Sequence, residues 1–342
     1  MERARRMLLG VYLEIRIIPV LLWSYSAVTL GTAIAWRAGG GSVPGYLVAL
    51  LEGLLLQGLV AHTVNEIADW QSGTDQDPAP RIISGGSKVV ASGLLTLKEL
   101  RVIGLAAGAL AVGVGIAAAA TWGWVLLFYG ALGLAGAVFY TVPPVRAAYR
   151  PLVGEGIALV CVWACAAGAF VLQRGTLTGE AAVAGLAHAA TCVGMLMLHH
   201  SLDRGPDSRA LPPKVTTVVR MGDRARAYRL GWAVLALGLS IGLVAGADTA
   251  FWPLVAGAAV ALVAHLAARE DDPASVTRAE LVVILAGMLG ALGSAVALSS
   301  VFAWALIPPA VLVPAEILVS GAAHKALLAE RAERYRLEGG PA

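Results

Sequence analysis

Apolar runs of about 20 residues recur along the whole chain, and they constrain its fold more than any other feature. Only 14% of the 342 residues are charged and 58% are hydrophobic, and the mean hydropathy is +0.76. A soluble domain carries about 25% charged residues, so the composition excludes an ordinary soluble protein. We therefore predict an all-α fold, a polytopic bundle of transmembrane helices around a central cavity.

The runs predict nine or ten spanning helices within a single domain that covers residues 1–342. The predicted spans cover about residues 15–37, 43–64, 100–121, 123–142, 152–173, 179–200, 227–246, 249–268, 279–300 and 303–323. The last two come from one stretch, Leu281–Ala323, which Ser299-Ser300 and three prolines interrupt. This stretch supplies either two spans, or one span and a broken or peripheral helix.

The distribution of Lys and Arg between the loops predicts the orientation in the membrane. Short cytoplasmic loops carry more Lys and Arg than the loops on the other side. If the basic N-terminus is cytoplasmic, the loops after even-numbered spans are basic and the others are nearly free of positive charge. The basic tail at residues 325–336 then also lies inside, which favours ten spans. We expect an integral protein of the cell membrane, and a net charge of +3 gives no indication of nucleic-acid binding.

A first group of acidic residues directly follows the second apolar run, at residues 65–75. Asn65 and Asp69 are four residues apart, so on a helix they share one face. Asp75 lies beyond Gly73, where we expect the helix to end and the chain to turn back. Acidic side chains at membrane depth are costly and mark functional sites by default.

A second group, Asp203 and Asp207, follows the sixth run, so the predicted topology places both groups on the cytoplasmic side. Carboxylates and an amide without Cys or His ligands suit a hard cation, typically Mg²⁺. Mg²⁺ in proteins is usually held by a few carboxylates together with substrate phosphates. Acids at helix ends also occur at ordinary interfaces, but two such groups on one side favour a shared site.

Basic residues close to both groups are candidates for binding a diphosphate. They are Arg81, Lys88, Arg146, Arg150, Arg209 and Lys214. The segment 84–87, Ser-Gly-Gly-Ser, could add backbone N–H groups for an anion. A plain turn is the simpler interpretation of that segment.

The first group resembles the first aspartate-rich motif of the UbiA superfamily of intramembrane prenyltransferases. The matching residues are Asn65, Asp69, Gly73 and Asp75, followed by Pro80-Arg81 and Gly85-Gly86. Their spacing is closest to the branch that prenylates 1,4-dihydroxy-2-naphthoate in menaquinone synthesis. The resemblance covers about residues 10–270, so the helix expected at about 303–336 is an addition to the usual nine-helix plan.

Two further segments match the same family in the expected order. The loop at residues 140–150 is similar to the loop after the family's fourth helix, and residues 203–222 are similar to its second motif. Two positions depart from the pattern: Glu66 stands where the family usually has Asp, and His200 stands where the second motif usually begins with Asn. These departures leave the acceptor open.

The resemblance implies transfer of a prenyl group from a prenyl diphosphate to an aromatic acceptor, with Mg²⁺ as cofactor. The implied metal ligands are Asn65, Asp69, Asp75, Asp203 and Asp207. The implied catalytic residues are Asp69 and Asp203, with Tyr140, Glu66 and His200 as candidates for positioning the acceptor or taking its proton. The prenyl tail would extend towards the lipid bilayer.

Two other functions remain open at this point. A terpene cyclase of the same superfamily would ionise the same diphosphate, and the double bonds of the substrate itself would capture the cation. A transporter with acidic ion sites would place its acids near the middle of the membrane in broken helices. Here the acids follow apolar runs at their ends, which favours an enzyme.

Overall fold

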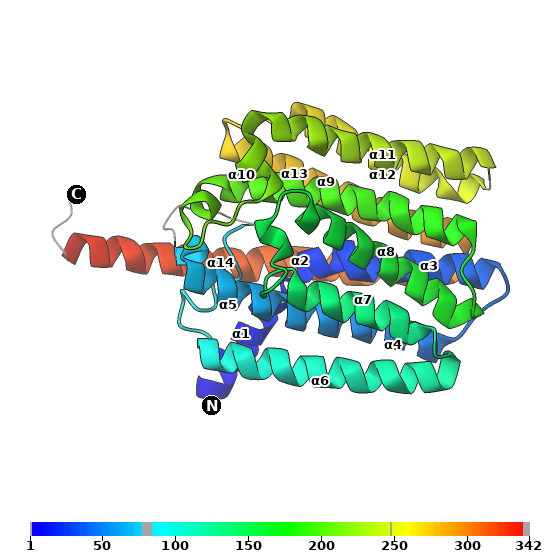
Figure 1. Cartoon of the computed structure of the whole chain (residues 1–342), viewed down its shortest axis with the longest axis horizontal. Helices are drawn as coiled ribbons and strands as arrows, with labels where there is room; N and C mark the ends of the chain where they lie inside the picture. Colours follow the sequence, from blue (N-terminus) through cyan, green and yellow to red (C-terminus); the bar gives the residue numbers. More distant parts are fainter. Residues whose placement is uncertain (1, 77–83, 247, 338–342) are drawn as a thin grey trace.

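The structure is a computed structural model that describes residues 2–76, 84–246 and 248–337, with side chains described within residues 3–322 of these ranges. The described residues form helices and loops and contain no strand. Figure 1 shows the long helices side by side in an elongated bundle. The predicted all-α architecture is therefore confirmed.

Nine helices among the described residues are long and apolar enough to cross a membrane, which makes this an integral membrane protein. The first combines α2 (Ile17–Val20), a π-helical segment (Leu21–Tyr25) and α3 (Ser26–Arg37). The second combines α4 (Val43–Gly53), a π-helical segment (Leu54–Ala61) and α5 (His62–Ser72). The others are α6 (Leu97–Trp122), α8 (Val153–Arg174), α9 (Gly179–Arg209), α10–α11 (Thr217–Met221 and Ala225–Gly246), α12 (Trp252–Ala267), α13 (Pro273–Leu298) and α14 (Ile307–Leu337).

A tenth apolar helix, α7 (Leu126–Phe139), is shorter than the others. It has 14 residues, and about 20 are needed to cross a hydrocarbon core. The run predicted as a span at 123–142 therefore forms a helix that is shorter than a spanning helix. The stretch Leu281–Ala323 forms two apolar helices, α13 and α14, joined by a 3-10 segment at Ser300–Leu306. A short helix, α1 (Glu2–Ile15), precedes the first span.

Helix α9 occupies the centre of the bundle, because 83% of its apolar window is buried, against 22% for α6 at the edge. Small residues let the helices approach closely. At Gly31 of α3, a Cβ atom would lie 2.0 Å from the carbonyl oxygen of Ala166 in α8. The abundant Gly and Ala therefore serve packing.

Helices α5 and α9 both continue beyond the predicted membrane spans, to Ser72 and Arg209, and α5 ends directly before Gly73 as predicted. Their last turns carry the two acidic groups. Figure 1 shows α5, α10, α1 and the end of α14 at the same end of the bundle. The fold thus brings both groups to one end, as the loop charges indicated.

Candidate active site

The first acidic group lies in the last turns of α5 and just beyond them. Asn65 and Asp69 share one helix face, and the Asn65 amide donates a hydrogen bond of 3.0 Å to Oδ2 of Asp69. Gly73, at φ +87°, ends the helix, and Thr74–Gln76 form a 3-10 turn. Asp75 is buried as a result, so the chain turns back where the sequence predicted.

The segment 84–87 packs directly against this group. A Cβ atom on Gly86 would lie 2.3 Å from Oδ2 of Asp75 and 2.5 Å from Oε2 of Glu66. The backbone N–H of Ser87 donates a 2.8 Å hydrogen bond to Oε2 of Glu66, and the Ser87 hydroxyl donates one of 2.6 Å to Oε2 of Glu14. The Ser87 N–H, considered above for an external anion, is therefore occupied by a carboxyl group of the chain.

The crowding of carboxyl groups affects their protonation. Burial raises the pKa of Asp75 well above its usual range, and the neighbouring Asp69 and Glu66 raise it further. Burial also raises the pKa of Glu14, and Glu66 adds to the shift. This end of the cavity therefore favours any ligand that brings positive charge to the carboxyl groups.

The second acidic group lies on the last turns of α9. Asp203 is buried and faces the same cavity as Asp69 and Asp75. Nε2 of His199 lies 3.5 Å from Oδ2 of Asp203, and Nδ1 of His199 lies 3.0 Å from Oε1 of Glu280 in α13. Asp207 is completely buried and is not among the side chains that line the cavity.

Lys214 connects the two groups. Its ammonium donates a 2.7 Å hydrogen bond to Oδ2 of Asp69 and lies 3.9 Å from Oδ1 of Asp207. Burial alone lowers the pKa of Lys214, but Asp69 and Asp207 raise it by more, so the pKa lies well above its usual range. Lys214 is therefore a permanent positive charge within the site.

The other predicted diphosphate-binding residues separate into two sets. Lys88 lines the cavity, and its ammonium donates a 3.1 Å hydrogen bond to the carbonyl of Ser84. Arg146 stacks over the ring of Tyr149 at 5.5 Å, and Arg150 donates to the carbonyl of Pro144 at 3.1 Å.

Neither Arg146 nor Arg150 is among the cavity-lining residues, and neither is Arg209, whose side chain is exposed. Arg81 lies outside the described residues. Of the six predicted cations, the structure brings Lys88 and Lys214 to the cavity.

Tyr140 and His200 both line the cavity, whereas Glu66 is behind its wall and contacts Ser87. The Tyr140 hydroxyl lies 3.5 Å from Nε2 of His200. Burial raises the pKa of Tyr140 above its usual range, so the phenol keeps its proton. The pair offers a hydroxyl and an imidazole next to the acidic groups.

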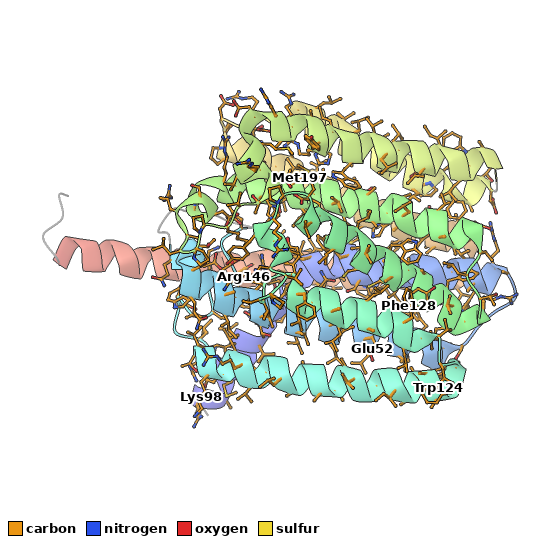
Figure 2. All side chains as sticks on the ribbon, viewed as in Figure 1. Glu52, Lys98, Trp124, Phe128, Arg146 and Met197 are labelled. Carbon is orange, nitrogen blue, oxygen red and sulfur yellow. The ribbon has the colours of Figure 1, made fainter. Side chains whose placement is uncertain are left out.

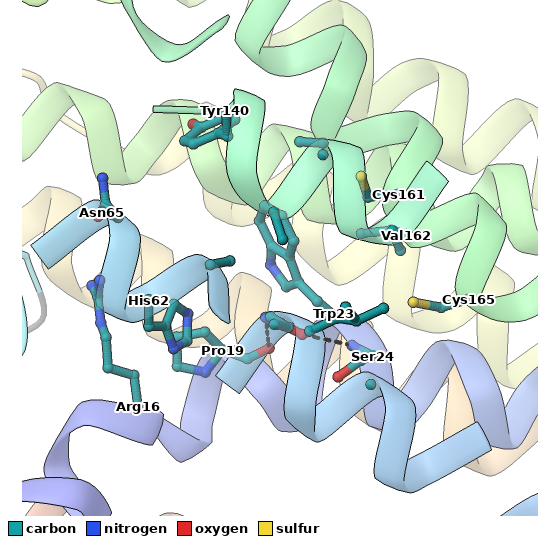
Figure 3. A pocket seen from close by; sticks show the side chains of 18 of the residues that line it. Arg16, Pro19, Trp23, Ser24, His62, Asn65, Tyr140, Cys161, Val162 and Cys165 are labelled. Carbon is teal, nitrogen blue, oxygen red and sulfur yellow. Dashed lines mark hydrogen bonds between the residues drawn. The ribbon is translucent and has the colours of Figure 1, made fainter. Parts of the chain in front are cut away.

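Arg16 is a site residue that the sequence analysis did not identify. It lies at the junction of α1 and α2 at φ +51° and lines the cavity. Its side chain forms no hydrogen bond or ion pair with the described residues. Figure 3 shows its side chain beside His62 and below Asn65. A single Arg inside the first apolar run, directly before Ile17-Ile18-Pro19, was the available signal.

A cavity of about 400 Å³ extends from these polar residues into the bundle. Figure 3 shows Arg16, His62, Asn65 and Tyr140 around one part of it and Cys161, Val162 and Cys165 around another. Apolar and small side chains line the inner part: Ala118, Leu126, Tyr129, Gly130, Gly133, Gly136, Ala169 and Leu172. One continuous space therefore joins a charged end, called here the polar end, to an apolar end.

The donor set fits Mg²⁺ only together with a ligand that brings oxygens of its own. Among the described residues, no three His, Cys, Asp or Glu side chains are placed to hold an ion without further ligands. However, Oδ1 of Asp69 and Oδ2 of Asp75 are buried and have no hydrogen-bond partner. Mg²⁺ commonly uses one or two carboxylates plus substrate phosphates, and these orphaned oxygens suit that arrangement.

The model of the UbiA prenyltransferase family matches residues 25–279, well over half of the chain. The chain belongs to the UbiA prenyltransferase family. The family resemblance expected from the two aspartate-rich motifs is thereby confirmed. The matched residues include every described candidate site residue except Arg16, and α14 lies beyond them.

Solved structures agree with the UbiA fold. A UbiA homologue from Archaeoglobus fulgidus bound to GPP and Mg²⁺ is 15% identical, covers 81% of this chain and 98% of its own, and gives a TM-score of 0.58. The apo structure of a UbiA homologue from Aeropyrum pernix K1 is 16% identical, with coverage of 79% and 96% and a TM-score of 0.59.

A third structure, of a digeranylgeranylglyceryl phosphate synthase, is 14% identical, with coverage of 85% and 99% and a TM-score of 0.55. The comparison with curated protein sequences gives no match. At these identities the likeness concerns the fold, which is that of intramembrane prenyltransferases.

Proposed function

We propose that this UbiA protein is a Mg²⁺-dependent transferase that moves a prenyl group from a prenyl diphosphate to an aromatic acceptor related to naphthoates or quinone precursors. The observation that carries the proposal is the single cavity that Asp69, Asp75 and Asp203 line at one end, while the other end is apolar. A prenyl diphosphate has a charged head and a hydrocarbon tail, and a cavity with one charged end and one apolar end suits both parts.

The polar end supplies what the departure of diphosphate requires. When bound there, Mg²⁺ would neutralise the charge that develops on the leaving oxygens. Asn65, Asp69, Asp75 and Asp203 would hold it, with Asp207 behind them next to Lys214. Lys88, Lys214 and Arg16 are fixed cations that line the cavity and would bind the diphosphate oxygens. The A. fulgidus homologue with GPP and Mg²⁺ supports this assignment.

The apolar end would hold the prenyl tail and keep water from the allylic cation that remains after the C–O bond breaks. The ring of the acceptor would then form the new C–C bond and lose a proton. Tyr140 and His200 both line the cavity beside the acidic groups. Tyr140, whose phenol keeps its proton, is the candidate for positioning the acceptor, and His200 is the candidate for taking that proton. Glu66 would instead hold the segment 84–87 in place.

The motif spacing supports a naphthoate-type acceptor, and the basic loops support a site that faces the cytoplasm from the cell membrane. The test is mass spectrometry of the products formed by purified protein from a panel of prenyl diphosphates, with and without naphthoate and benzoate acceptors. A prenylated acceptor that disappears with EDTA and returns with Mg²⁺ is expected.

Two results would contradict the proposal. A hydrocarbon or terpene alcohol formed without any acceptor would mean a terpene cyclase. Full activity of a metal-free preparation would exclude the assigned role of the acidic groups.

A further inference from the structure

Glu52 is an acidic residue in the apolar part of the cavity wall, away from both motifs. It lies on α4 and lines the cavity, and its Oε1 is buried without a hydrogen-bond partner among the described residues. Figure 2 shows it between the two ends of the bundle. An ionisable side chain inside a membrane bundle is costly and marks a function by default.

Gln57, the next polar residue after Glu52 on the same helical span, already has partners. Gln57 donates to the carbonyl of Pro19 at 3.1 Å and accepts from the N–H of Ser24 at 3.2 Å. On the facing helix α6, a Cβ atom on Gly115 would lie 3.5 Å from Oε1 of Glu52, in ordinary contact. The carboxyl group of Glu52 therefore lies between the cavity, a glycine and an amide whose hydrogen bonds are already made.

Glu52 lies part of the way along the region of the cavity that would hold the prenyl tail. It precedes Asn65 by thirteen residues on one continuous helical span, which places it about 20 Å from the polar end at 1.5 Å per residue. The cavity continues beyond it, because Val48, one turn further from the polar end on α4, also lines it, together with Leu126 and Leu172. A short chain bound at the polar end would stop before Glu52, and a long chain would pass it.

A hydrocarbon chain that passes Glu52 would cover its carboxyl group without offering a hydrogen bond. Burying a polar group without a partner is unfavourable, whereas a chain that ends earlier leaves the cavity-facing side of the carboxyl uncovered. We propose that Glu52 determines chain-length specificity by selecting against prenyl chains that extend past it. The inference rests on the proposed function, since it assumes that the apolar end holds the prenyl tail.

The test compares kcat/KM for hexaprenyl diphosphate, whose tail is longer than the distance to Glu52, with kcat/KM for geranyl diphosphate in three proteins. In Glu52→Leu the ratio of long to short substrate should rise about tenfold or more, which corresponds to about 1.4 kcal/mol. Glu52→Gln keeps a polar group of the same size, so its ratio should stay close to that of the wild type. Glu52→Met provides a second apolar variant if the Leu variant does not fold.

The outcomes separate the two proposals. An unchanged ratio in an active Leu or Met variant would overturn the role of Glu52 and leave the proposed function intact. A Gln variant that shifts as far as the Leu variant would also overturn it, because the amide is equally polar. A wild-type protein that turns over neither diphosphate would contradict the proposed function itself.

Discussion

At the polar end of the cavity, two residues connect four buried carboxyl groups, whereas the apolar end is held by contacts between small and aliphatic residues. Lys214 bridges Asp69 and Asp207, and Ser87 bridges Glu66 and Glu14. At the apolar end, Gly136 faces Cys161 on the neighbouring helix. Hydrogen bonds depend on direction and distance, while apolar contacts adjust by small shifts. The polar end should therefore be far more sensitive to a single substitution.

The largest expected effect comes from removing a carboxyl group of the polar end that faces the cavity. Asp203→Ala should lower kcat/KM by about 1,000-fold, since the group would act on charge that develops in the transition state. The measurement is prenyl transfer at saturating Mg²⁺, with the melting temperature as a check on folding. Asp223→Ala is the control, because its side chain is 97% exposed and its loss should change little. Near-wild-type activity of Asp203→Ala would contradict the proposed role of Asp203 in the reaction.

A smaller effect at the same end should follow from crowding the carboxyl groups instead of deleting one. Gly86→Ala would bring a methyl group onto Asp75 and Glu66, and a displacement of about 1 Å in an active site can cost about 100-fold in rate.

Gly93→Ala is a matched control, because Gly93 has φ +69° against +72° for Gly86 but nothing within 4 Å of a new Cβ. Both variants share the backbone strain of a positive φ, so a loss of stability should be common to them. Equal activity of the two variants would show that the position of Asp75 does not matter.

The smallest effect is expected at the apolar end. Gly136→Ala would place its Cβ 2.1 Å from Sγ of Cys161, and overpacking of this kind costs about 1 kcal/mol of stability when the neighbour can shift. Gly130→Ala on the same helix meets nothing within 4 Å and should leave the melting temperature unchanged. Both variants should keep most of their activity with a short prenyl diphosphate. A large loss of turnover in Gly136→Ala would contradict the expected difference between the two ends in their sensitivity to a single substitution.

Much of the fold could be predicted from hydropathy, because the bilayer requires long apolar helices whatever their neighbours are. The predicted membrane spans differ most from the helices at the polar ends of α5 and α9, which continue to Ser72 and Arg209, whereas the predicted spans stop near residues 64 and 200. Hydropathy falls where the polar residues begin, but the helices continue because other parts of the chain bury those residues. The run at 123–142 deviates in the opposite direction, since only Leu126–Phe139 is helical.

The sequence grouped the candidate acids, but it gave no means to tell which of the six candidate cations reach the cavity; among the described ones, Lys88 and Lys214 line it. The four-residue spacing of Asn65 and Asp69 determines a shared helix face, and Gly73 determines where that face ends. Nothing in the spacing distinguishes Lys214, which reaches Asp69 at 2.7 Å, from Arg150, which is engaged with its own loop. Long flexible side chains on loops are positioned only by the packing around them.

The sequence by itself determined the membrane class, the helical architecture and the two acidic groups, because each follows from local composition or spacing along one helix. Only the tertiary structure decided which residues share a cavity. It brought Arg16 and Lys88 to the polar end, placed Glu66 behind the wall against Ser87, and set Glu52 in the wall of the same cavity. The physical reason is that these relations join helices and loops distant in the chain, and their distances depend on how the whole bundle packs.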